Sequence, residues 1–365
     1  MASAMKATPQ SVEANWQQIA TRGYSVQPFL DPPEVEALKR LYDTTVPEVP
    51  SPFFLSVFMA TDVRRTILQG FCSILNQKLA VLAPGFRIVG ASFAVKKSGS
   101  VNGRLGLHQD CSLVDYDKHM GLNIWVPLCD VDSNNGCLRV APYTQRLNFV
   151  GFLPPVASPC ASFERGLGEP YLSALPMKAG DACLFDGRLF HASEENHSKQ
   201  DRVAAFFNII PADQPIRLNF RNPETPDRLD VYHANTEFIL QFNPLIYPDE
   251  GQLNNVTYVE SIQFQERKLS LADLAALHPK AEITESLAVT RSTEPSTSHT
   301  SSAPAFWARL LTRFRRGQQY TVALSDPTSC FQEGAQPNCQ QTTRPRRIRR
   351  SAMHADRLSS KRRKL

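Results

Sequence analysis

Hydrophobic residues recur every three or four positions in the first quarter of the chain, the spacing that buries one face of an α-helix. This pattern predicts one helix over residues 11–22, a second that begins after Asp31 and ends before Pro47, and a third over residues 61–82. Asp31 is a suitable N-cap because Glu34 follows it at the third helical position. We expect these amphipathic helices to brace one side of a larger core.

After the third helix, the pattern changes to short runs of β-branched and aromatic residues separated by turn signals. The predicted strands cover residues 24–26, 86–96, 120–129, 137–141, 182–185, 188–191 and 202–210. Residues 151–174 are rich in Pro, Gly and Ser and are expected to form an irregular insertion. The fold class predicted is mainly β: a double-stranded β-helix (a cupin-like jelly roll), braced by the N-terminal helices.

The composition of the chain indicates its cellular compartment. Apolar residues make up 42% of the 365 positions, enough for a sizeable core. No stretch approaches the roughly 20 apolar residues of a membrane span, and the N-terminus lacks the pattern of a secretory leader. The eight cysteines include no C-x-x-C pair, and several stand in apolar runs. We therefore expect a cytoplasmic protein with buried free thiols and no transmembrane segment.

The net charge of +5 is unevenly distributed. Residues 286–365 hold 15 Lys and Arg against 4 Asp and Glu, a net of +11, which leaves −6 for residues 1–285. We expect residues 1–285 to form the folded domain, and residues 286–365 to be a linker and a disordered basic tail. Residues 306–314 also have the pattern of a short basic amphipathic helix. Binding of nucleic acid or a membrane surface through the tail is therefore an alternative function.

The strongest candidates for chemistry are His108 and Asp110. On an extended strand, residues i and i+2 face the same side, so both side chains can reach one ion while Gln109 points away. His191, on a predicted strand far downstream, would complete the two-histidine, one-carboxylate set of non-haem Fe(II) sites. By itself an H-x-D tripeptide is weak evidence, because it occurs by chance in many chains and a lone histidine on a strand is more often structural than a metal ligand. A glycine-rich approach, His191 and the nearby Arg202 favour the metal site.

Ordered sequence blocks along the chain form a recognisable family pattern. The blocks are Leu107–Asp110, Asn123–Leu128, Asn134–Val140, Ala179–Ala182 with Phe185 and Asp186, and His191–Ser193 with Asp201–Ala204. Together they resemble the phytanoyl-CoA dioxygenase family of Fe(II)- and 2-oxoglutarate-dependent oxygenases. The resemblance extends over roughly residues 15–245.

The resemblance implies a set of site residues and ligands. Fe(II) would be held by His108, Asp110 and His191, with 2-oxoglutarate and O2 as co-substrates. Arg202 stands where the family places the arginine that pairs with the distal carboxylate of 2-oxoglutarate, and a guanidinium suits that bidentate role. Two weaker candidates for the co-substrate pocket are Trp125 and Lys96. A core aromatic is the alternative for Trp125, and a solvated strand-end lysine is the alternative for Lys96.

The predicted activity is hydroxylation of a C–H bond in a small organic molecule, with release of succinate and CO2. Asp110 favours hydroxylation over halogenation, because related halogenases have a small residue at that position. Residues 142–145 read Pro-Tyr-Thr-Gln where the family often has Pro-Gly-Ser-His, which predicts a different loop or substrate pocket. A CoA thioester, a secondary metabolite, a lipid and an amino-acid-derived substrate all remain open. The rival hypothesis is a non-catalytic jelly roll that binds the metal or 2-oxoglutarate.

Overall fold

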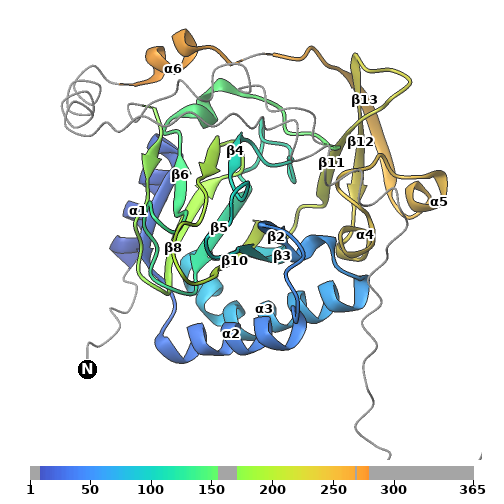
Figure 1. The fold of residues 1–365 in the computed structure, drawn as a ribbon. Helices are drawn as coiled ribbons and strands as arrows, with labels where there is room; N and C mark the ends of the chain where they lie inside the picture. Colours follow the sequence, from blue (N-terminus) through green and yellow to red (C-terminus); the bar gives the residue numbers. More distant parts are fainter. Residues whose placement is uncertain (1–8, 155–170, 268, 279–365) are drawn as a thin grey trace, which may run out of the picture. The chain divides into compact units, whose positions relative to one another are not determined.

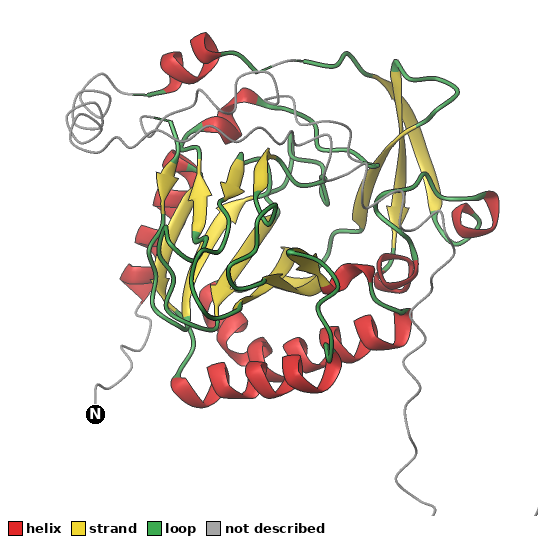
Figure 2. Cartoon of the chain, in the orientation of Figure 1, coloured by secondary structure: helices red, strands yellow, loops and turns green. Residues whose placement is uncertain are grey.

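A computed structural model of the chain describes residues 9–154, 171–267 and 269–278 (Figure 1). This part of the chain is mainly β, with antiparallel sheets and fewer helices than strands (Figure 2). The predicted tail and the predicted domain boundary at residue 285 lie outside it. Within these ranges, no helix is both long enough and apolar enough to cross a membrane.

The largest sheet has six strands in the order β1-β8-β5-β10-β3-β2. Their bounds are β1 Tyr24–Pro28, β2 Phe53–Leu55, β3 Phe86–Lys96, β5 Leu122–Pro127, β8 Asp181–Asp186 and β10 Arg202–Pro211. Strand β10 lies between β3 and β5 and pairs with β3 along its whole length. The strands predicted over residues 86–96 and 202–210 are confirmed. Both are largely apolar runs bounded by turns, a pattern typical of buried strands.

A four-stranded sheet packs against the inner face of the large one. Its order is β4-β9-β6-β7, with β4 Leu105–His108, β6 Leu138–Val140, β7 Ser173–Ala174 and β9 His191–Ser193. A shared core fills the space between the sheets: Trp125, Cys183 and Phe185 from the large sheet meet Leu138 and Val140 from the small one. Two facing antiparallel sheets of this kind confirm the predicted double-stranded β-helix.

Three helices cover the other face of the large sheet (Figure 1). They are α1 Pro9–Arg22, α2 Pro32–Thr45 and α3 Thr61–Leu82, and all three were predicted. The ring of Phe71 on α3 lies 5.2 Å from that of Phe93 on β3 and 5.9 Å from that of Phe207 on β10. Gly23, with φ of +93°, ends α1 in a left-handed conformation that glycine adopts without strain.

A third sheet, β11-β12-β13, was not predicted. It consists of β11 Ile216–Arg221, β12 Arg228–Ala234 and β13 Thr257–Gln263, and α4 Thr236–Gln241 and α5 Glu250–Leu253 pack against its core. Helix α6 Leu271–Leu277 lies elsewhere, packed through Leu274 against Leu107 and Ala192 of the small sheet. Phe220 lies at the centre of the core of the third sheet, within 6.4 Å, centroid to centroid, of the rings of Tyr232, Phe238, Phe242 and Tyr247. Strand β13 is exposed along most of its length, so its sequence lacks a strong apolar alternation.

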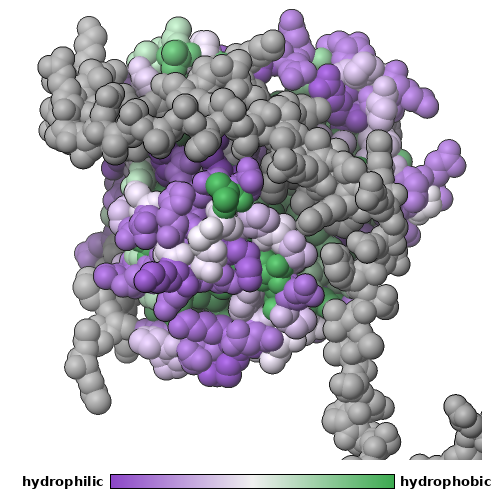
Figure 3. Space-filling view, in the orientation of Figure 1, coloured by the Kyte–Doolittle hydropathy of each residue, from purple (hydrophilic) through white to green (hydrophobic). Residues whose placement is uncertain are grey.

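One predicted strand is displaced. Residues 188–191 were expected to form a strand that ends at His191, but β9 begins at His191. The cause is a turn held by Asp186, whose carboxylate accepts the backbone N–H of Arg188 at 2.8 Å and pairs with its guanidinium at 2.8 Å. Short 3-10 helices also occur, at η1 Ser56–Phe58 and η2 Thr144–Leu147. On the face drawn in Figure 3, hydrophilic side chains predominate and hydrophobic ones form small patches.

Candidate metal and co-substrate site

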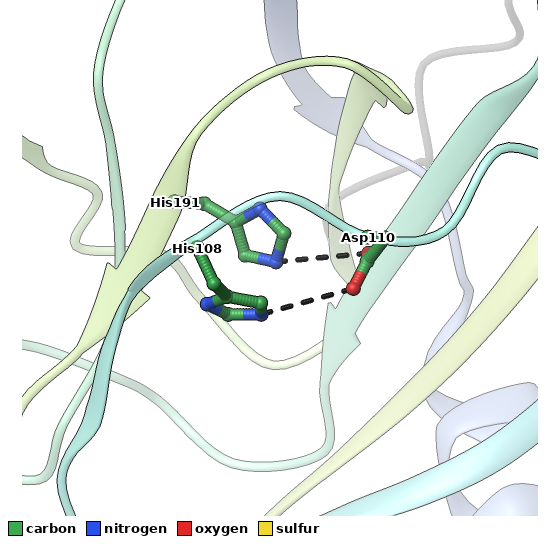
Figure 4. Close-up of side chains that lie close together, drawn as sticks. All are labelled: His108, Asp110 and His191. Carbon is green, nitrogen blue, oxygen red and sulfur yellow. Dashed lines mark ion pairs between the residues drawn. The ribbon is translucent and has the colours of Figure 1, made fainter. Parts of the chain in front are cut away.

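Three side chains converge at one end of the small sheet (Figure 4). His108 is the last residue of β4, His191 is the first of β9, and the two are partners in the register of these strands. Their ring centroids are therefore only 4.2 Å apart. Asp110 follows β4, and its two carboxylate oxygens lie 3.7 Å from Nε2 of His108 and 3.7 Å from Nε2 of His191. One ligand atom from each residue lies within 4.8 Å of the others.

The other ring nitrogens fix the tautomers of the two imidazoles. Nδ1 of His108 lies 2.8 Å from the carbonyl oxygen of Gly106, and Nδ1 of His191 lies 3.1 Å from that of Leu189. A carbonyl only accepts, so in the neutral form of either ring Nδ1 carries the proton and Nε2 presents a lone pair. Burial, reinforced by the neighbouring His108, lowers the pKa of His191 to about 4. His191 is therefore neutral near pH 7, the form in which imidazole binds metals.

Asp110 is supported by two amide side chains from the large sheet. Its Oδ2 accepts a hydrogen bond of 2.6 Å from Nδ2 of Asn123 on β5. Oδ1 of Asn123 in turn accepts one of 2.7 Å from Nδ2 of Asn208 on β10. Neither asparagine was predicted to have a role. The signal in the sequence was a polar residue within an apolar run of each strand.

Two cations lie opposite each other on β3 and β10. Lys96 and Arg202 are register partners, and both are almost fully buried, with exposed fractions of 0% and 2%. Nη1 of Arg202 donates to the carbonyl oxygen of Ala94 at 3.1 Å, and the guanidinium lies 5.4 Å from the ring centroid of Trp125. Its Nε is buried and has no hydrogen-bond partner within the part of the chain that the structure describes. Burial lowers the pKa of Arg202 to about 10.

The ammonium group of Lys96 lies 5.1 Å from the ring centroid of Phe53 and, among the described residues, donates to two backbone oxygens. Its Nζ donates to the carbonyl of Gly103 at 2.5 Å and to that of Ser193 at 3.2 Å. Burial, with the nearby Arg202 adding to it, brings the pKa of Lys96 well below its usual value. Across the part of the chain that the structure describes, neither Lys96 nor Arg202 has a carboxylate within ion-pair distance. The alternative of a solvated lysine at position 96 is therefore wrong.

The structure also places three other residues considered in the sequence, Trp125, Gln109 and His197. Trp125 is 5% exposed and packs in the core between the sheets, so the core alternative holds, and its ring also lies beneath Arg202. Gln109, which was expected to point away from the metal ligands, donates through Nε2 to the carbonyl of Phe149 at 3.1 Å. His197, an exposed residue, lies at the surface as expected.

The residues present fit a metal with an anionic co-ligand. Two neutral imidazoles and one carboxylate, with lone pairs directed toward a common point, form the facial donor set of non-haem Fe(II). Buried cations without counter-charges are costly, and a carboxylate ligand would remove that cost. Side chains alternate along β10, so Arg202 lies on the same face of that strand as Asn208, whose hydrogen bonds lead to Asp110. The three metal-binding side chains and the two cations therefore lie in the same interior of the fold.

Comparison with known protein families gives an independent result. Residues 43–204 match the family model described as Phytanoyl-CoA dioxygenase (PhyH). The chain is 28% identical over 127 residues to the phytanoyl-CoA dioxygenase domain-containing protein 1 homolog of Dictyostelium discoideum, covering 33% of this chain and 45% of that protein. It is 25% identical over 157 residues to phytanoyl-CoA dioxygenase domain-containing protein 1 of Danio rerio, covering 41% and 51%. The match spans about half the length of these relatives.

Solved structures with partial similarity include two proteins with a bound metal ion. One is the epimerase SnoN in complex with Fe3+, alpha ketoglutarate and nogalamycin RO, with a TM-score of 0.46, 17% identity and coverage of 66% of this chain and 93% of that one. The other is HygX from Streptomyces hygroscopicus with nickel, 2-oxoglutarate and hygromycin B bound, with a TM-score of 0.43, 17% identity and coverage of 57% and 88%. The resemblance of this chain to the phytanoyl-CoA dioxygenase family, predicted from its sequence blocks, is confirmed by the family match over residues 43–204.

Proposed function

We propose that this chain is an Fe(II)- and 2-oxoglutarate-dependent dioxygenase. One observation carries the proposal: two imidazoles and a carboxylate meet in the same fold that buries two cations, neither of which has a carboxylate within ion-pair distance among the described residues. A metal ion suits the two imidazoles and the carboxylate, and a dicarboxylic acid suits the two cations. The proposed ligands of the metal are His108, Asp110 and His191.

The proposed roles follow from the contacts of each residue. When bound, Fe(II) and 2-oxoglutarate supply an oxidant from O2, with release of succinate and CO2. Arg202 has an unpartnered Nε and a planar guanidinium, which match the distal carboxylate of the co-substrate in bidentate fashion. Trp125 packs against the guanidinium and keeps water from it. Lys96, held by two backbone carbonyls, adds a second positive charge from the facing strand.

The proposed reaction is hydroxylation of an unactivated or weakly activated C–H bond in a small organic substrate. Asp110 supports this assignment because its carboxylate occupies the position that a halide would need. The body of the chain is mildly acidic, with a net charge of −6 over residues 1–285. That charge gives no particular support to a polyanionic CoA thioester, so we keep secondary metabolites, lipids or acyl compounds, and amino-acid derivatives as substrate classes.

Two further proposals concern the whole chain. We assign the catalytic domain to residues 1–285 and treat residues 286–365 as a separate basic tail. Free thiols support a reducing, cytoplasmic location: Cys137 and Cys183 are buried and unpaired, and burial raises the pKa of both.

The test is turnover of 2-oxoglutarate by the full chain reconstituted with Fe(II). We expect O2 uptake and succinate formation that require 2-oxoglutarate, stop on chelation of the metal, and rise with a correct substrate whose product gains one oxygen atom. His191→Ala should remove this turnover, whereas His197→Ala, at an exposed histidine, should not. A wild-type protein that binds 2-oxoglutarate but forms no succinate with any substrate class would instead support the non-catalytic jelly roll.

A further inference from the structure

Two amide side chains connect the centre of the large sheet to Asp110. Asn123 and Asn208 are register partners on β5 and β10, which brings their side chains together on one face of the sheet. Nδ2 of Asn208 donates to Oδ1 of Asn123, and Nδ2 of Asn123 donates to Oδ2 of Asp110. Asn123 is 3% exposed. Asn208 and Asp110 are half-buried, so the connection is shielded from bulk water at its centre.

The chemistry of the amide group gives this connection a direction. An ionised carboxylate can only accept hydrogen bonds, so Asp110 is stabilised only when Asn123 presents its NH2 end. The two ends of an amide have almost the same shape, so packing alone does not choose between them. Asn208 makes the choice, because its own NH2 group faces the oxygen of Asn123 and would face a second donor if Asn123 turned over.

The third strand supplies room for Asn208. Gly90 on β3 is its register partner on the side opposite Asn123. A Cβ atom added at Gly90 would lie 3.0 Å from Oδ1 of Asn208, tighter than an ordinary van der Waals contact. A side chain at position 90 would therefore press on Asn208. Three adjacent strands thus fix the position of one asparagine.

We propose that Asn208 and Asn123 are positioning residues that orient Asp110 for metal binding. This inference rests on the proposed function above. Asn208 holds Asn123 in one amide orientation, Asn123 engages Oδ2 of Asp110, and Oδ1 stays without a hydrogen bond among the described residues and is free to bind a metal. Neither asparagine touches the metal itself. Loss of such a supporting partner typically reduces metal affinity by roughly 10–100-fold.

The experiment measures the affinity of the full chain for Co(II), which binds to the same kinds of ligand as Fe(II) and has visible absorption. Asn208→Asp keeps the size of the side chain but replaces its donor by an acceptor, so Asn123 should turn over and present its oxygen to Asp110. Asn208→Ala removes the donor and leaves Asn123 free. We expect affinity to fall in the order wild type, Asn208→Ala, Asn208→Asp, with the last weaker than wild type by roughly 10–100-fold.

This order separates the proposal from two simpler effects. A packing role predicts that Asn208→Ala, which leaves a cavity, binds Co(II) more weakly than the nearly isosteric Asn208→Asp. An electrostatic role predicts that the added charge of Asn208→Asp strengthens cation binding. Either result overturns the proposal. Asn123→Leu tests it again if Asn208→Asp does not fold: it removes the donor with little change in volume, and an affinity equal to wild type also overturns the proposal.

The wild-type titration distinguishes the two levels of inference. If wild type binds no Co(II), the proposed function and this inference both fail. If wild type binds one Co(II) per chain and the asparagine variants bind it equally well, only the positioning role fails. Thermal unfolding of the metal-free variants identifies those that fold, and the affinity order is read from these alone.

Discussion

Lys96 and Arg202 face each other on paired strands, and both are buried without a carboxylate partner in the described part of the chain. Two like charges placed together away from water destabilise a fold unless a ligand neutralises them. Both also have a lowered pKa because of burial. Such perturbed groups gather at functional sites, and here they are suited to a dianionic co-substrate.

Replacing Arg202 separates its binding role from its structural one. Arg202→Met should weaken 2-oxoglutarate binding by about 2–5 kcal/mol, the usual effect of removing one partner of a buried, hydrogen-bonded charge pair. The metal-free protein should be equally stable or more stable, because an apolar side chain replaces an uncompensated charge. Calorimetric titration of 2-oxoglutarate and thermal unfolding measure the two effects. A large loss of stability with unchanged affinity would mean that Arg202 is only structural.

Lys96 should make the stability of the fold depend on pH. Its pKa is lowered in the folded state by burial and Arg202, with Arg104 acting in the same direction and Glu194 and Glu195 acting against them. The unfolded chain therefore binds more protons between the folded pKa and the unfolded value of about 10.4. Below this window Lys96 destabilises the fold by the full amount, and the destabilisation disappears as pH rises through it.

Lys96→Met removes that titration. The variant should be more stable than wild type at about pH 7, and the difference should shrink toward about pH 10 as Lys96 loses its proton in both states. Urea denaturation of the two proteins at both pH values measures it. A difference that stays constant with pH would show that the ammonium group is not destabilised in the fold.

The helical face of the large sheet should determine stability without changing the site. Phe71 is fully buried on α3, between the rings of Phe93 and Phe207. Phe71→Ala should lower the free energy of unfolding by about 3–5 kcal/mol because it leaves a cavity. Val81 on the same helix is 55% exposed, so Val81→Ala should change it by less than about 0.5 kcal/mol. Both variants, measured where they are folded, should bind Co(II) like wild type.

The helices and strands that were predicted correctly are those whose own sequences carry a clear hydrophobic pattern. Residues 61–82 form α3 because their apolar positions repeat at the helical period, and residues 86–96 form β3 because they are enriched in β-branched and aromatic residues. The predicted start of β9 was wrong, since the backbone N–H of Arg188 donates to the carboxylate of Asp186 and holds these residues in a turn. The third sheet was missed because β13 is mostly exposed.

In the site as well, residues marked by their spacing in the sequence were predicted, and residues whose role depends on strand pairing were not. His108, Asp110 and His191 were named from spacing and family resemblance, and the structure brings them together. The roles of Asn123 and Asn208 could not be predicted, since their contact depends on the register of β5 against β10. Burial of Lys96 also required the tertiary structure, because β2 and the residues around Gly103 cover the end of its strand.

The most direct test of the account is anaerobic addition of 2-oxoglutarate to the Fe(II)-loaded full chain, followed by visible absorption. A metal-to-ligand charge-transfer band should appear and saturate at one iron and one 2-oxoglutarate per chain, because the acid binds to the metal held by His108, Asp110 and His191. The band should be absent without iron and in His191→Ala, and present in His197→Ala, which replaces an exposed histidine. Binding of 2-oxoglutarate with equal affinity and no band, whether or not iron is present, would contradict the account.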